Sequence, residues 1–390
     1  MNGGSVGMDF LYQVRRFADL DPVHIDGFIF KLHYWFTSTA IFSASLISFA
    51  KQYFGDPIEC IFDAKHGAEI KAVDAYCWLH STTNLDTGLM RKLNTLPKIR
   101  NPCQGYPMAD HDIDTLYYQW VPFFLFFQAL IFRLPWNLWR HLEGGKMAEF
   151  GLEAKRHLIP EQTSESLAHQ YAHFFNGILH HNNIYFWQYV FCESLNVFIV
   201  FGMIQLTDKF LNGRFIDYGR RVWEFYWSSE SYRADRMNPM CSLFPTVTSC
   251  QFPSGALTGN LNVDHAMCVL SLNIINDKIF LIEWFWFITL AFMSLLASFC
   301  TFLIIICPRF RRFLIRMKLR SFGAQDVPLI NQLLTRCYVG DWFILNLLAK
   351  NTTAYMFRRI IKSLTEIIKE QRISKTATIS MENLEVKNGV

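Results

Sequence analysis

The sequence predicts an all-α membrane protein with four transmembrane helices, disulfide-stapled extracellular loops that hold a small amount of β and α structure, and a helical cytoplasmic domain. Two observations lead to this prediction. The 390-residue chain is 51% hydrophobic and contains 37 Phe, yet its mean hydropathy is only +0.14. Strongly apolar blocks separated by polar segments average in this way. The cysteines also gather in particular polar segments, and the segments 1–28 and 140–183 contain none.

Four apolar runs are long enough to cross a bilayer core of roughly 30 Å as helices. The second is the clearest, because eighteen uncharged residues lie between Asp114 and Arg133. The predicted organisation is an N-terminal segment 1–28, a first span 29–50, a loop 51–116, a second span 117–139, a polar loop 140–183, a third span 184–206, a loop 207–278, a fourth span 279–306 and a tail 307–390.

Two arguments orient the chain, and they agree. Basic residues crowd the start of the tail, as they do in cytoplasmic flanks, so both termini are expected in the cytoplasm. Disulfides persist outside the cell, so the two cysteine-bearing loops are expected outside. The basic residues are Arg309, Arg311, Arg312, Arg316, Lys318 and Arg320, and the loop cysteines are Cys60, Cys77, Cys103, Cys241, Cys250 and Cys268. Spacing does not choose among the fifteen pairings that six cysteines allow.

Nothing in the sequence points to an enzyme. It holds no phosphate-binding glycine motif, no nucleophile elbow and no zinc spacing, so no catalytic, cofactor or metal site is predicted. A scattered net charge of +4 does not favour nucleic acid as a partner. The pairs His169/His173 and His180/His181 fit solvent-facing or subunit-contact histidines better than metal ligands. Glu193 and Glu283 fall within spans, where a carboxylate is a functional candidate by default.

One stretch has a family resemblance. Tyr117-Tyr118-Gln119-Trp120-Val121-Pro122-Phe123 resembles the signature of the innexins, the invertebrate gap-junction channel family, which is related to the pannexins. The loop segments 51–60, 76–78, 244–250 and 268–273 resemble innexin loops as well. We interpret Tyr117 to Trp120 as an interfacial anchor at the extracellular end of the second span, with Pro122 allowing a bend.

The resemblance implies which cysteines pair. Innexin loops are stapled in nested fashion, which corresponds here to Cys60–Cys268 and Cys77–Cys250. Cys103 and Cys241 depart from the family pattern of two cysteines per loop. A third nested bridge between them is one hypothesis, and two free thiols are the other. The family's N-terminal segment folds into the pore, so the pore-lining candidates are Asp9, Phe10, Gln13, Arg15 and Arg16.

The resemblance also implies the function. The chain is expected to be a multi-pass plasma-membrane subunit of a gap junction. It is expected to assemble into a homo- or hetero-oligomer of innexin subunits, with eight subunits in a ring, and to contact membrane lipids. Two such hemichannels on adjacent cells would dock through their extracellular loops and pass ions and small metabolites. The alternatives are a non-junctional hemichannel that releases small metabolites and a non-conducting junctional adhesion protein.

Overall fold

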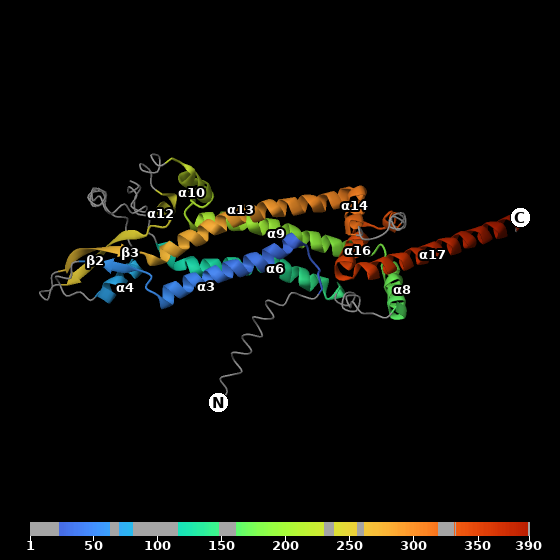
Figure 1. Ribbon diagram of the computed structural model, residues 1–390, viewed down its shortest axis with the longest axis horizontal. Helices are drawn as coiled ribbons and strands as arrows, with labels where there is room; N and C mark the ends of the chain where they lie inside the picture. The colour runs from blue at the N-terminus through green and yellow to red at the C-terminus, as the bar shows by residue number, and fades with distance from the viewer. Residues whose placement is uncertain are drawn as a thin grey trace, which may run out of the picture. The chain divides into compact units, whose positions relative to one another are not determined.

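The computed structural model is mainly helical (Figure 1) and describes residues 23–62, 70–80, 116–147, 161–229, 238–255, 261–318, 331 and 333–388. The chain divides into two compact units. The loop unit comprises Ile29–Pro135 and Ser194–Leu296. The tail unit comprises Met1–Phe28, Trp136–Glu193 and Ala297–Val390.

Three helical stretches in the described part of the chain are long and apolar enough to cross a membrane, by length and composition. They are Tyr117–Glu143, Asn183–Phe210 and Ser271–Ile306. The first stretch joins the short 3-10 helix η2 (Leu116–Trp120), from its second residue on, to the helix α6 (Val121–Glu143). The other two stretches are the helices α9 (Asn183–Phe210) and α13 (Ser271–Ile306). The first predicted span is also helical without a break, as α2 (Phe28–Lys31), the π-helix η1 (Leu32–Thr37) and α3 (Ser38–Phe54).

Helix α13 begins at Ser271, well before the predicted start near residue 279. Its first turns carry Asn273, Asn276 and Asp277, which a hydropathy pattern assigns to a loop. These three residues are buried, and Asn276 accepts a hydrogen bond from Ser48 at 3.1 Å. The helix therefore starts on polar residues whose partners lie in other elements of the loop unit.

Three of the four buried residues of α3 are serines, and the fourth is Ile41. Ser38 donates to the carbonyl of Ala129 at 2.8 Å, and Ser45 donates to the carbonyl of Pro122 at 2.7 Å. In lipid, apolar surface gives no driving force between helices, so close packing of small residues and interhelical hydrogen bonds replace it. The large apolar side chains of α3, such as Phe42 and Ile47, are exposed.

The loop unit contains a three-stranded antiparallel sheet with the strand order β1-β3-β2. Its strands are β1 (Glu59–Ile61), β2 (Val247–Gly255) and β3 (Leu261–Val269). Short helices accompany it: α4 (Ile70–His80), α10 (Tyr218–Trp227) and α12 (Pro239–Leu243). One strand comes from the first cysteine-bearing loop and two come from the second, so the two loops share a single sheet.

The tail unit is helical, with α8 (Glu161–Gly177), α14 (Pro308–Lys318), α16 (Val339–Asn351) and α17 (Ala354–Asn388). Helix α17 packs against α8 and buries an apolar stripe that includes Met356, Ile360 and Leu364. The sequence after Ser374 reads as disordered by composition. That prediction is wrong for the described residues, because α17 continues to Asn388.

Helix α16 is fixed to the start of α9 by a buried carboxylate. Asp341, at 0% exposure, accepts from the side-chain amide of Asn182 at 2.8 Å and from the backbone amide of His180 at 3.1 Å. Beside it, a Cβ on Gly340 would lie 2.3 Å from the carbonyl carbon of Asn182. The two helices therefore approach so closely that position 340 has no room for a side chain.

Candidate functional site

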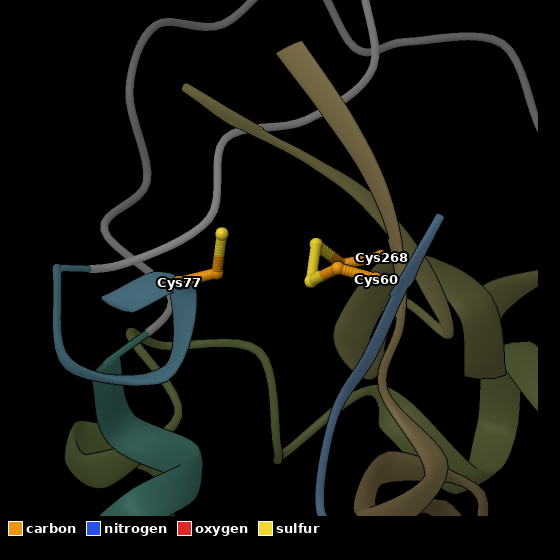
Figure 2. A group of neighbouring side chains, drawn as sticks. All are labelled: Cys60, Cys77 and Cys268. Carbon is orange, nitrogen blue, oxygen red and sulfur yellow. A yellow bond between two sulfur atoms is a disulfide. The ribbon is translucent and has the colours of Figure 1, made fainter. Parts of the chain in front are cut away.

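Two disulfides join the first loop to the second. Cys60–Cys268 links β1 to β3 at directly paired positions, and Cys77–Cys250 links α4 to β2. Figure 2 shows the first bond between neighbouring strands, with Cys77 beside it on its helix. The bridged residues lie 208 and 173 positions apart in the sequence. These are the nested pairs that the resemblance implies.

The sulfur atoms of Cys60, Cys77 and Cys268 lie within 4.8 Å of one another. This cluster has the size of a metal site, but the chemistry does not fit one. Metal-binding cysteines are thiolates, whereas all three sulfurs here are consumed in disulfides. The cluster instead marks the place where the two bridges pack against each other.

Of the other two loop cysteines, Cys241 is among the described residues and Cys103 is not. Cys241 lies in α12, is 2% exposed and is disulfide-bonded. The remaining described cysteines, Cys192, Cys300, Cys307 and Cys337, are free thiols.

A small apolar core surrounds the two bridges. Its buried members from the loops include Ile58, Val73 and Phe252. The amide of Cys60 also donates to the carboxylate of Asp74 at 2.8 Å, which ties β1 to α4. Tyr118, from the head of the second span, is buried in the same core at 0% exposure.

The signature stretch holds the loops to the second span through several separate contacts. The Tyr117 hydroxyl donates to the carbonyl of Leu243, in the second loop. The Gln119 side-chain amide donates to the carbonyl of Trp78, in the first loop. The rings of Trp78 and Tyr118 lie 5.0 Å apart between centroids. One short 3-10 helix thus contacts both loops and the disulfide core.

This arrangement changes the interpretation of Tyr117 to Trp120 as an interfacial anchor. Trp120 is 63% exposed, as an anchor in lipid would be, but Tyr118 is fully buried. Val121 is also buried, in the core of the helices. Pro122 stands at the second position of α6, where a missing N–H costs little. The proline inside this helix is Pro135.

The pore-lining candidates Asp9, Phe10, Gln13, Arg15 and Arg16 lie outside the described residues. The described residues 24–26 are held in the tail unit by hydrogen bonds. Asn351 clamps the backbone of His24, accepting from its amide at 2.6 Å and donating to its carbonyl at 2.7 Å. Trp139 donates to the carbonyl of Ile25 at 3.1 Å.

Lys350 completes this attachment by donating to the carbonyl of Asp26 at 2.9 Å. Burial lowers the pKa of Lys350, while the charges of Asp26 and Glu193 oppose that shift. Glu193 itself accepts from Thr301 at 2.7 Å. The clamp at Asn351 was not foreseeable from periodicity. The residue reads in the sequence as the acceptor of the sequon Asn351-Thr352-Thr353.

The other polar candidates occupy separate places. Glu283, in α13, is buried at 5% exposure and belongs to the loop unit. The rings of His169 and His173 lie side by side on α8, tilted against each other, with centroids 4.8 Å apart. The Nδ1 atom of His180 lies 3.6 Å from Oδ2 of Asp341. The described residues place no third metal-ligating group with the histidine pair on α8.

Comparison with known proteins shows the family of this chain. The innexin family model matches residues 26–368. The chain belongs to the innexin family. It is 32% identical to innexin inx2 of Drosophila melanogaster over 360 residues, which is 92% of this chain and 95% of the relative. It is 33% identical to innexin inx2 of Schistocerca americana over 367 residues, 94% of this chain and 99% of that protein.

A third relative, innexin shaking-B of Drosophila melanogaster, is 32% identical over 361 residues, covering 92% of this chain and 94% of the relative. Innexins are four-span membrane proteins. Three candidate spans are long and apolar enough by length and composition, and the unbroken helix from Phe28 to Phe54 lies where the first span is predicted. The expectation of an all-α, four-span fold with disulfide-bonded loops is confirmed.

The Gln119 contact predicts a measurable loss of stability. In Gln119→Leu, the Trp78 carbonyl loses its donor at nearly constant side-chain volume. We expect the free energy of unfolding to fall by about 1–2 kcal/mol. The thermal midpoint of the purified full-length protein in detergent measures this loss.

The matched control is Trp120→Phe, at the neighbouring exposed position, which is expected to leave the midpoint unchanged. Equal midpoints for wild type, Gln119→Leu and Trp120→Phe would show that the signature amide does not hold the first loop.

Proposed function

We propose that this innexin is a structural subunit of an intercellular gap-junction channel that passes ions and small metabolites. The observation that supports this proposal most is the loop architecture. Both cysteine-bearing loops are joined into one disulfide-bonded sheet. A surface ordered before binding loses less conformational entropy on docking than two free loops do. A membrane protein that meets a partner in an apposed membrane needs such a surface.

The proposed orientation places both loops outside the cell and both termini in the cytoplasm. Arg309, Arg311 and Arg312 lie on α14, directly after the fourth span, as the positive-inside rule requires of a cytoplasmic flank. Disulfides in both loops suit the oxidising side. The sequon at Asn351 is compatible with this orientation, since the side chain is 1% exposed and its amide is hydrogen-bonded.

A ring of subunits is part of the proposal, because one four-helix subunit cannot enclose a wide pore. We propose a homo- or hetero-octamer that docks with an opposing hemichannel, with the N-terminal segment entering the pore. Asp9, Phe10, Gln13, Arg15 and Arg16 are then the candidates for lining it. The attachment of His24 to Asn351 supports a fixed base for that segment.

Electrical recording from paired cells tests the proposal. If both cells express the full chain, we expect junctional conductance, and removal of residues 2–20 is expected to change the unitary conductance or gating while the protein still reaches the surface. A homotypic pair without conductance is repeated against a cell that expresses innexin inx2 of Drosophila melanogaster.

Each outcome separates the candidate functions. Conductance between cells in either pairing supports a junctional channel. Currents restricted to unpaired cells would assign the chain to the hemichannel alternative. Surface protein with neither kind of current would favour the adhesion alternative and contradict the proposal.

We also propose that the disulfide at Cys241 is made with Cys103, as a third bridge between the loops. The other described cysteines are either paired with one another or free, which supports this assignment. Non-reducing peptide mapping of the full chain is expected to recover a Cys103–Cys241 peptide pair. Alkylation of either thiol without prior reduction would contradict the third bridge.

A further inference from the structure

A half-open cavity of about 460 Å³ lies in the tail unit, where the second span ends and the third begins. Lys146, just past α6, and Tyr185, in the first turn of α9, contribute to its lining. Because consecutive spans emerge on the same face of the membrane, this cavity stands at a membrane–water boundary whichever way the chain is oriented. Its volume is within the range of small-molecule binding sites.

The lining is amphipathic. The apolar part includes Ile178, Ile184 and Ile344. Ile344 is 7% exposed and belongs to the interior, whereas Ile184 is 73% exposed and continues the cavity toward the apolar surface of α9. Trp187, on the same helix, is 56% exposed, as is common for tryptophan at a lipid interface. An acyl chain could reach the cavity along this surface.

The polar part favours an anion. Lys146 is exposed, and its ammonium group lies 5.4 Å from the centre of the Tyr185 ring. None of the described residues that line the cavity is acidic. Glu143 lies near Tyr185, but its carboxylate accepts from the backbone amides of Gly145 and Met147 at 2.8 and 2.5 Å and is not part of the lining.

An unpartnered buried donor points in the same direction. Tyr185 is 6% exposed, and its hydroxyl has no hydrogen-bond partner among the described residues. A buried polar group left without a partner destabilises the protein, so a ligand atom that accepts from this hydroxyl would remove that penalty. Gln188 also lines the cavity and adds a second side-chain donor.

We propose that this cavity binds an anionic phospholipid of the surrounding bilayer, with the phosphate at Lys146 and the Tyr185 hydroxyl and an acyl chain along the isoleucines. Lys146 and the Tyr185 hydroxyl fit the phosphate of such a lipid, and the apolar surface that begins at Ile184 fits its acyl chain. In the proposed orientation this is the cytoplasmic leaflet, which is rich in anionic lipid. Only the choice of leaflet rests on the proposed function, because the binding chemistry does not depend on the orientation of the chain.

Native mass spectrometry of the full-length protein in neutral detergent tests the proposal by counting bound lipid per subunit. With added phosphatidylglycerol we expect retained lipid, and with phosphatidylcholine little. Lys146→Gln is expected to weaken retention roughly tenfold, as loss of a charge-assisted hydrogen bond would. Tyr185→Phe is expected to weaken it less.

The matched control is Arg140→Gln, which removes the same charge near the same end of α6 from a residue that does not line the cavity. Equal losses in Arg140→Gln and Lys146→Gln would show diffuse surface charge and overturn the site. So would absence of retained lipid in the wild type, or displacement of the lipid by soluble glycerol phosphate. Thermal midpoints measured without lipid confirm that the variants are folded. Lipid counts do not depend on conduction, so a silent channel and an empty cavity are separate failures.

Discussion

The covalent link between the two cysteine-bearing loops is the constraint on which the loop structure depends. Strand β1 contributes only three residues to the sheet, too few to hold a loop by ladder hydrogen bonds alone. The two bridges close very long stretches of chain, 208 and 173 residues, and bridges of this kind contribute about 2–5 kcal/mol each. Tyr118 then fills the core beside them. Covalent closure and a small apolar core together make one body out of segments from opposite halves of the sequence.

The family signature acquires a physical meaning from this arrangement. Its polar atoms reach backbone carbonyls of both loops, through Tyr117 to Leu243 and through Gln119 to Trp78. Because the same residues continue into α6, the orientation of the loop sheet is coupled to the second span. A channel that docks through its loops and conducts through its helices needs that coupling to be stiff. The signature therefore connects the two loops to the second span.

The sequence predicted the spans because the hydropathy of a segment can be read without knowing its partners in the fold. Uncharged apolar runs of about eighteen residues or more indicate transmembrane helices. The sequence misjudged features that depend on partners. Asn276 reads as loop but is a helix residue bonded to Ser48. Tyr118 reads as an interfacial aromatic but is a core residue. Cysteine spacing left the pairing open, and only family resemblance suggested it. The cavity at Tyr185 left no sequence signal, since it is formed by residues of helices far apart in the chain.

In this innexin the disulfides, and not the spans alone, hold the two loops as one folded body. Amide hydrogen exchange of the full-length protein, before and after reduction with a small-molecule thiol, tests it most directly. We expect reduction to remove protection from β1 and α4 while α9 and α13 keep theirs. Unchanged protection of β1 and α4 after verified reduction of both bridges would contradict it.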